Sequence, residues 1–330
     1  MPRPIVHIGY HKTATTWFQK HFYPCVRNAR FVARERVRAA LLEVGAFHFD
    51  PETARAELGV AEKESVTLCE EGLSGYLHNG GLGGHLSRAA AERIQAVFPD
   101  ARIVIFIRSQ PSIVAASYEQ YVRGGGTYSL RRYAFAGNYL KGARSEFHRA
   151  PRFTFDHYEY GPLIAHYRSL FGADNVHVFP FEAFRKDSRA FLEDYARTLD
   201  LDVDIPALTI RATNRAYGLR VMDIVRLLNL LTSRTVIDKQ YLVHIPYWYA
   251  LVRGIGEGLN ALPLLGRSAP AEAVLGREVH DWIRQRYWRS NRALMEATGL
   301  PLDAFGYPVD PPDRELAEPG PPRWLRWWGN

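Results

Sequence analysis

The first apolar segment of the chain is a short β-branched run that passes through a loop into a helical pattern. Ile5 to Ile8 has the composition of a buried strand, Gly9 ends it, and the run that begins at Trp17 predicts a helix. A strand that leads through a loop to a helix N-terminus directs unpaired main-chain N–H groups and the positive end of the helix dipole at one point. This segment therefore predicts a site for an anion the size of a phosphate.

The loop in this segment carries one lysine and three threonines, but it is not a nucleotide-triphosphate P-loop. In that motif the lysine directly follows the second of two glycines. Here Lys12 lies three residues after Gly9, with no second glycine between them. The next strong strand ends at Arg108, where an NTPase would place a metal-binding aspartate. The loop therefore predicts an anion site of another kind.

The loop resembles the 5′-phosphosulfate loop of the sulfotransferases, whose usual forms are KxGTTxL and KSGTTW. Four of its residues match these forms, and Ala14 stands in the place of the usual glycine. The resemblance implies that 3′-phosphoadenosine 5′-phosphosulfate (PAPS) binds here. It also implies that Trp17 either stacks on the adenine or belongs to the core. The residues that the resemblance assigns to the cofactor in this segment are His11, Lys12, Thr13, Ala14, Thr15, Thr16 and Trp17.

A second motif follows the strand Ile103–Ile107. It resembles the 3′-phosphate element of the same family, in which an arginine closes a strand and a serine lies on the next helix. Arg108 supplies a planar, permanently charged group that matches the geometry of a phosphate. The family's spacing from arginine to serine ends one residue before Ser117. The resemblance thus implies Arg108 with Ser117, and Ser109 and Ser112 are alternatives.

Two glutamates lie between these motifs. Val66–Cys69 predicts a central strand, so Glu70 and Glu71 fall at its carboxyl end, which is the edge where open parallel sheets bind ligands. Sulfuryl transfer to an alcohol needs a general base, and a partly buried carboxylate can act as one. We assign this role to Glu71. The alternative is that both glutamates are acids at a helix N-terminus, stabilised by its dipole.

Composition and length indicate one sizeable enzyme. A chain of 330 residues with 47% hydrophobic content can bury a large core. The two cysteines have no metal-ligand spacing and no signal peptide is visible, which predicts a reduced, cytoplasmic setting without a bound metal. The formal charge of +7 favours an anionic ligand. No motif predicts nucleic-acid binding.

Strand patterns alternate with helical patterns along most of the chain. This alternation predicts an α/β fold, an open three-layer parallel sheet with helices on both faces, and extra C-terminal helices. We expect residues 1–215 to form the PAPS-binding core and residues 216–330 to form a mainly helical extension packed on it. Further predicted strands and helices are Val176–Pro180, Leu86–Phe98, Tyr160–Phe171, Ser188–Leu199, Leu219–Leu231 and Ala271–Ala297.

Three segments have more than one interpretation. The glycine-rich run Gly75–Gly84 is either a flexible loop over the substrate or a linker. The apolar run Tyr241–Val252 is either a packed helical cap, which we favour, or an element that contacts a membrane surface or the acceptor. The tail that carries Trp324, Trp327 and Trp328 suits a membrane interface or docking on the domain.

These observations predict a PAPS-dependent sulfotransferase that needs no metal. Lys12 and Glu71 are the expected catalytic residues, and adenosine 3′,5′-bisphosphate is the expected product. A carbohydrate or glycan hydroxyl is the first choice of acceptor, followed by a lipid or a small molecule. The alternatives are a nucleotide-dependent kinase or phosphotransferase and a non-catalytic domain that binds phosphorylated ligands.

Overall fold

The computed structural model describes residues 3–61, 64–139, 152–210, 216–266 and 268–320. The chain groups into two compact units that alternate along the sequence. The first unit contains residues 1–109, 156–213 and 290–309, and the second contains residues 110–155, 214–289 and 310–330. The tail with its three tryptophans lies outside the described residues.

The first unit is built on one sheet of five parallel strands in the order β2-β3-β1-β4-β5. The central strand β1 pairs with β3 through Val6 and Leu68, and with β4 through Val6 and Ile103. Strands β3 and β4 are nearly continuous buried runs, as expected where both faces of a sheet are covered. The bounds of the five strands are β1 Ile5–His7, β2 Arg30–Phe31, β3 Val66–Cys69, β4 Arg102–Ile107 and β5 Val176–Pro180.

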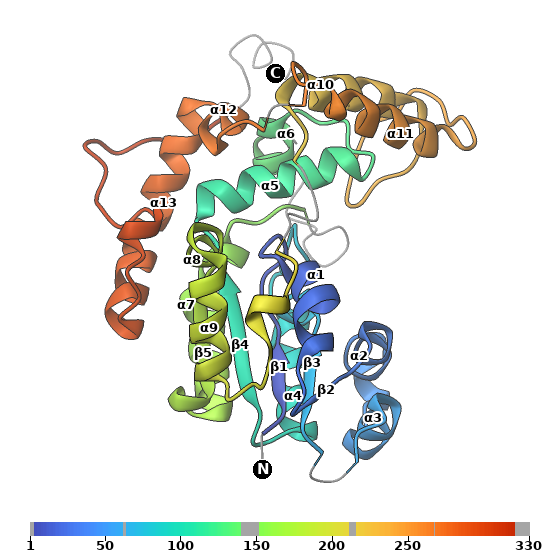
Figure 1. Cartoon of the computed structure of the whole chain (residues 1–330). Helices are drawn as coiled ribbons and strands as arrows, with labels where there is room; N and C mark the ends of the chain where they lie inside the picture. Colours follow the sequence, from blue (N-terminus) through green and yellow to red (C-terminus); the bar gives the residue numbers. More distant parts are fainter. Residues whose placement is uncertain (1–2, 62–63, 140–151, 211–215, 267, 321–330) are drawn as a thin grey trace. The chain divides into compact units, whose positions relative to one another are not determined.

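Helices cover both faces of this sheet (Figure 1). From β1 the chain crosses over β3 to β2, toward one edge of the sheet. From β3 it later crosses over β1 to β4, in the opposite direction. Because crossovers between parallel strands are right-handed, these two connections lie on opposite faces. The helices of this unit are α1 Thr15–Trp17, α2 Arg34–Leu41, α3 Pro51–Leu58, α4 His85–Val97, α7 Tyr160–Phe171, α8 Phe181–Lys186 and α9 Ser188–Thr198.

One face of the sheet holds an aromatic core. Phe18 and Phe22 come from a π-helical turn, Phe18–Phe22, that follows α1, and they pack with Tyr195 of α9. The ring of Phe18 also packs at a tilt of 56° against that of Phe106 of β4, with ring centroids 5.1 Å apart. This core fixes the helical run after β1 against the sheet and so fixes the loop that joins them.

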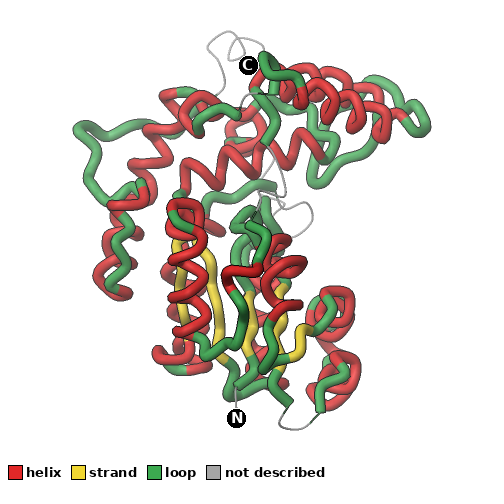
Figure 2. The backbone as a smooth tube through the Cα atoms, viewed as in Figure 1, coloured by secondary structure: helices red, strands yellow, loops and turns green. Residues whose placement is uncertain are grey.

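The second unit is mainly helical within its described residues, as the tube in Figure 2 shows. Helix α10 packs against both α5 and α11. The helices of the second unit are α5 Gln110–Arg123, α6 Leu130–Ala134, α10 Leu219–Leu228, α11 Trp248–Ala261 and α12 Ala271–Leu275. Helix α13, Arg277–Thr298, begins in this unit and ends in the first. No helix among the described residues is long and apolar enough to cross a membrane.

The open parallel α/β sheet predicted from the sequence is confirmed. Strand β3, strand β5 and helix α7 have the predicted bounds. Residues 77–81 of the glycine-rich run are buried, and a Cβ at Gly75 would lie 2.4 Å from the carbonyl oxygen of Gly80. Its role as a substrate loop or a linker stays a prediction. One interpretation is corrected. The apolar run does not pack as a cap over its whole length, because Tyr241–Tyr247 is exposed and helix begins only at Trp248.

Candidate functional site

The loop after β1 starts at the carboxyl edge of the sheet, beside β4. The N–H groups of Ile8 and Tyr10 donate to the carbonyls of Val104 and Phe106, each at 3.0 Å. Between them Gly9 has no room for a side chain, since a Cβ there would lie 2.6 Å from Nε2 of His7. Hydrogen bonding to β4 therefore continues past His7 as far as Tyr10, and the loop leaves the sheet after that residue.

The loop turns back on itself around a cluster of main-chain donors. Lys12 and Ala14 both have the left-handed conformation, with φ of 64° and 67°. The N–H groups of Thr13, Ala14, Thr15 and Thr16 donate to no acceptor within the described residues. Alternation of left-handed residues along a loop turns successive N–H groups toward one point and makes an anion-binding concavity. The predicted anion site thus has a physical basis in the backbone.

Ala14 holds a conformation that glycine adopts more easily, which gives a stability prediction. A left-handed alanine costs about 1–2 kcal/mol, and the extra freedom of glycine in the unfolded chain offsets about 0.4–1 kcal/mol of the gain. Ala14→Gly should therefore raise the free energy of unfolding by about 0.5–1 kcal/mol, measured by urea denaturation. Thr13→Gly is the control and should lower it, because Thr13 has no positive φ and its hydroxyl donates to the carbonyl of Tyr10. A loss of stability in Ala14→Gly would contradict the prediction.

Arg108 lies beside this loop, at the end of β4. Its guanidinium donates to the carbonyl of Lys12 at 2.8 Å and lies over the ring of Phe181, 5.1 Å from the centroid. Its own carbonyl accepts from the hydroxyl of Tyr160 at 2.5 Å. The structure therefore brings together two residues that the sequence motifs assigned separately to the cofactor, and it places a permanent cation at the edge of the anion site.

The serines proposed to assist Arg108 occupy different environments. Ser109 belongs to the same unit; its N–H donates to Glu182 at 3.0 Å and its hydroxyl donates to the carbonyl of Gly306 at 3.2 Å. Ser117 is buried in α5 of the second unit, where its hydroxyl donates to the carbonyl of Ile113 at 2.8 Å. Ser112 also lies in α5. The assignment of a serine to the 3′-phosphate stays a prediction.

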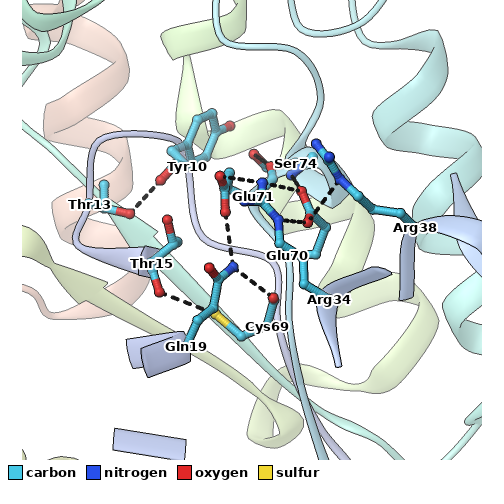
Figure 3. Close-up of polar contacts among 11 residues, drawn as sticks. Tyr10, Thr13, Thr15, Gln19, Arg34, Arg38, Cys69, Glu70, Glu71 and Ser74 are labelled. Carbon is cyan, nitrogen blue, oxygen red and sulfur yellow. Dashed lines mark hydrogen bonds and ion pairs between the residues drawn. The ribbon is translucent and has the colours of Figure 1, made fainter. Parts of the chain in front are cut away.

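Glu71 is held from two sides (Figure 3). One carboxylate oxygen accepts from Nη2 of Arg34 at 2.7 Å, and the other accepts from the side-chain amide of Gln19 at 3.2 Å. Gln19 also donates to the carbonyl of Cys69, at 2.9 Å, which ties the helical run after the loop to the end of β3. Burial alone would raise the pKa of Glu71, but the positive charges of His11, when its ring is protonated at low pH, and of Arg34 outweigh burial and lower it. The carboxylate is therefore ionised at neutral pH.

The contacts of Glu70 give its side chain a structural role. Its side chain is 0% exposed, accepts from the N–H of Gly72 at 2.9 Å, and pairs with Arg34 and with Arg38, the latter at 3.2 Å. It is the N-cap of the short 3-10 helix Glu71–Ser74. The interpretation of the two glutamates as acids at a helix N-terminus therefore holds for Glu70.

Three histidines lie in the loop or beside it: His11 belongs to the loop, the ring of His157 lies 4.9 Å from that of Tyr10, and His78 is close enough to feel the charge of Lys12. His11 is half-buried, and its Nδ1 is buried with no hydrogen-bond partner among the described residues. Burial lowers the pKa of His11, although the charges of Glu71 and Glu70 act in the opposite direction. Burial lowers the pKa of His78 and of His157 to about 3, and the neighbouring charges of His11 and, for His78, Lys12 add to the effect. Neutral histidines thus lie close to the lysine of the anion site.

Trp17 lies in the aromatic core. It is 3% exposed, its ring lies 5.2 Å from that of Phe184, and its indole N–H donates to the carbonyl of Thr209 at 3.4 Å. Of the two roles considered for Trp17, this position serves the core. Four neighbours of the loop escaped the sequence analysis, because no local pattern marks them: Gln19, Arg34, His78 and His157.

No group of three or more histidine, cysteine or acidic side chains in the described part of the chain is arranged to hold a metal ion. Cys25 is exposed and Cys69 is buried at the end of β3, and both are free thiols. The described ionisable groups at the loop include Lys12, Arg108, Glu71 and the three histidines, together with Arg34 and Glu70, whose charges act on His11.

Comparison with known proteins gives distant structural likeness only. No protein-family model and no curated protein sequence matches the chain. A sulfotransferase from Alicyclobacillus acidocaldarius is similar with 17% identity and a TM-score of 0.45, over 64% of this chain and 87% of the other. Mouse sulfotransferase SULT7A1, complexed with PAP, has 15% identity and a TM-score of 0.39, over 90% and 89%.

A third similar structure is the sulfotransferase domain from the curacin biosynthetic pathway, with 12% identity and a TM-score of 0.33 over 84% of this chain and 97% of that domain. All three are sulfotransferases. Likeness at these TM-scores is too distant to transfer a function to this chain, so the residues of the site have to carry any functional argument.

Proposed function

We propose that the protein is a PAPS-dependent sulfotransferase that moves a sulfuryl group to an acceptor hydroxyl. The observation that carries the proposal is the loop after β1, in which four consecutive N–H groups have no acceptor within the described residues while Lys12 and Arg108 supply positive charge. The motif resemblance of this loop and of the β4 end adds the identity of the cofactor. The loop would hold the 5′-phosphosulfate, and Arg108 the 3′-phosphate.

The proposed reaction is an in-line displacement at sulfur. The acceptor oxygen forms a bond to sulfur as the bond from sulfur to the bridging phosphate oxygen breaks. The electron pair of that bond leaves with the phosphate, giving adenosine 3′,5′-bisphosphate, and the hydroxyl proton goes to a base of the protein. Lys12 would stabilise the charge that grows on the leaving oxygen. Glu71 would take the proton, because it is ionised and lies at the same edge of the sheet.

Histidine offers a second proton acceptor at the same place. His11 is next to Lys12 in the chain, and its lowered pKa leaves the ring neutral near pH 7 and therefore able to accept a proton. Glu71 is committed to Arg34 and Gln19, which weakens it as a base. Both residues belong to the proposed site, and the variants described in the Discussion distinguish them.

For the acceptor we propose a carbohydrate hydroxyl. The direct test incubates the protein with radiolabelled PAPS and a panel of glycan, lipid and phenol acceptors, and measures label transfer and release of bisphosphate. Transfer to a glycan is the expected result. Binding of bisphosphate without transfer to any acceptor would favour a non-catalytic phosphate-binding domain. Transfer of phosphate from ATP would favour a phosphotransferase.

The 3′-phosphate assignment gives a binding prediction. Adenosine 3′,5′-bisphosphate should bind without magnesium and far more tightly than AMP or ATP, as measured by calorimetry. Arg108→Ala should weaken bisphosphate binding by about 2–4 kcal/mol if the charged contact is buried in the complex. The same variant should bind AMP, which lacks the 3′-phosphate, almost as tightly as the unmodified protein does.

Arg108 also supports the loop through the carbonyl of Lys12, so a control is needed. Arg108→Lys keeps the charge but loses the planar fork, and it should retain part of the bisphosphate affinity. Equal affinity of the unmodified protein for AMP and bisphosphate would contradict the 3′-phosphate site. An equal loss for both ligands in Arg108→Ala would reduce Arg108 to a support of the loop.

A further inference from the structure

The second unit exposes an apolar loop that the proposed reaction does not use. In the run Tyr241–Tyr247 every residue is exposed, and the apolar side chains are large. The exposed fractions are 51% for Tyr241, 78% for Leu242, 49% for Val243, 39% for Ile245 and 92% for Tyr247. Monomeric proteins seldom expose so many large apolar side chains in one place unless the surface binds something.

The backbone of this loop is fixed although its side chains are exposed. The N–H of Leu242 donates to the carbonyl of Leu230 at 2.8 Å, and the N–H of Ile245 donates to the carbonyl of Leu231 at 3.0 Å. The indole of Trp248 donates to the carbonyl of Leu228 at 2.8 Å. The loop therefore lies against the end of α10, and its apolar side chains are presented in a defined arrangement.

Two neighbouring helices extend the apolar surface. Leu227, near the end of α10, is 62% exposed, and Leu251, in the first turn of α11, is 53% exposed. Between the loop and α11, Tyr247 has φ of 61°, a conformation that costs a non-glycine residue free energy. A strained aromatic residue that is almost fully exposed is not explained by packing within the chain. We call Leu227, Tyr241–Tyr247 and Leu251 the apolar tip.

The charges around the apolar tip point to the kind of partner. From Arg234 to Glu257 the chain has three cations, Arg234, Lys239 and Arg253, and two carboxylates, Asp238 and Glu257. Arg253 pairs with Glu257 at 3.1 Å, whereas Arg234 is exposed and lies over the ring of Tyr249. Tyrosine and tryptophan at the border between apolar and polar side chains suit the interface of a bilayer, and basic residues beside them attract anionic headgroups. No described helix can cross a membrane, so the contact would be peripheral.

We propose that the apolar tip docks the protein on an anionic lipid surface, with Leu242, Val243 and Ile245 entering the region between headgroups and acyl chains. A protruding loop suits a bilayer better than it suits a globular partner, because aliphatic side chains at a tip can be buried in lipid without a matching groove. The tyrosines would lie at the level of the headgroups, and Arg234, which lies over the ring of Tyr249, would face the anionic phosphates.

The test is co-sedimentation of the full chain with vesicles of phosphatidylcholine alone and with phosphatidylserine added, without PAPS or acceptor. The protein should bind the anionic vesicles, and salt should weaken the binding. The triple variant Leu242→Ser, Val243→Ser, Tyr247→Ser should lose at least about tenfold in partitioning, because each buried apolar side chain contributes this much or more. Phe47→Ser is the matched control, since Phe47 is 101% exposed but lies in the first unit, and it should bind as the unmodified protein does.

Three outcomes would overturn the proposal. The first is that the unmodified protein stays in solution with every vesicle, and the second is that the triple variant binds as well as the unmodified protein. The third is concentration-dependent dimerisation that the triple variant abolishes, seen by sedimentation equilibrium, which would make the apolar tip a contact between copies of this chain. An unchanged midpoint of urea unfolding shows that the triple variant is folded, and vesicle binding is read without cofactor or turnover, so the test does not depend on the proposed reaction.

Discussion

Replacement of Lys12 by alanine is expected to lower turnover about 10²–10³-fold while weakening bisphosphate binding much less. The reason is that negative charge on the bridging oxygen grows as the bond to sulfur breaks, so a cation placed there stabilises the transition state more than the ground state. The structure places Lys12 directly before Thr13–Thr16, whose N–H groups donate to no acceptor in the described part of the chain, and its charge is close enough to lower the pKa of His78. Single-turnover rates and calorimetry with adenosine 3′,5′-bisphosphate measure the two effects separately.

The chain offers a matched control for this variant. Lys20 is an exposed lysine on the π-helical turn after α1, so Lys20→Ala removes the same charge without touching the loop, and both its rate and its affinity should stay near normal. Alanine at position 12 keeps a Cβ in the left-handed conformation, so backbone strain is the same in both proteins. If Lys12→Ala lowers rate and bisphosphate affinity by the same factor, Lys12 is a binding residue and not a catalytic one.

The parts of this structure that the sequence predicts well depend on local patterns. A β-branched run such as Val66–Cys69 is buried on both faces, so composition alone marks it as a strand of a parallel sheet. The anion site is predictable for the same reason: strand, glycine, loop and helix follow one another within Ile5–Trp17, and the N–H groups that form the site belong to the same loop. No long-range contact is needed to recognise it.

The partners of Glu71 could not be predicted in this way. Arg34 lies 37 residues earlier in the chain and reaches Glu71 only because the two-residue strand β2 pairs with β3 and starts α2 beside it. A strand of two residues has no period that sequence analysis can detect. The pairing with Arg34 changes the expected chemistry of Glu71, since it lowers the pKa of the carboxylate that was chosen as the base.

The apolar run Tyr241–Val252 shows a different limit. Its composition is that of a core segment, and the sequence analysis favoured packing. Within this run only Val252 is buried, and all seven residues of Tyr241–Tyr247 are exposed. Hydrophobicity predicts that a segment avoids water, but it does not tell whether the segment finds its partner within the chain or outside it.

Glu71 and His11 are the two candidate proton acceptors, and the surroundings lower the pKa of each for a different reason. Glu71 keeps its charge to a pH below the ordinary range of a glutamate, because Arg34, and His11 once its ring is protonated at low pH, lower its pKa. His11 is neutral at and above pH 7, because burial lowers its pKa. Both are therefore in the form that accepts a proton at neutral pH, and the pH dependence of the rate above pH 7 should be flat for either one. Substitution separates them.

Glu71→Gln is expected to lower turnover by about 10²-fold or more, with little change in bisphosphate affinity, because the amide keeps the shape of the carboxylate but cannot take a proton. His11→Asn should then have a smaller effect on the rate. The outcome that reverses the assignment is a near-normal rate in Glu71→Gln together with a large loss in His11→Asn, which would make His11 the base and Glu71 a positioning residue.

Stability has to be measured alongside these rates, because the neighbouring carboxylate is structural. Glu70 is buried and paired with Arg34 and Arg38, and breaking such a buried pair costs about 3–5 kcal/mol. Glu70→Gln should therefore show a lowered midpoint of urea unfolding and is unsuitable as a control for the chemistry. Glu92→Gln is a better one, since Glu92 pairs with Arg88 on the exposed side of α4. Its rate and stability should both stay near normal, and a Glu71→Gln protein that unfolds as readily as Glu70→Gln would show that the loss of turnover is structural.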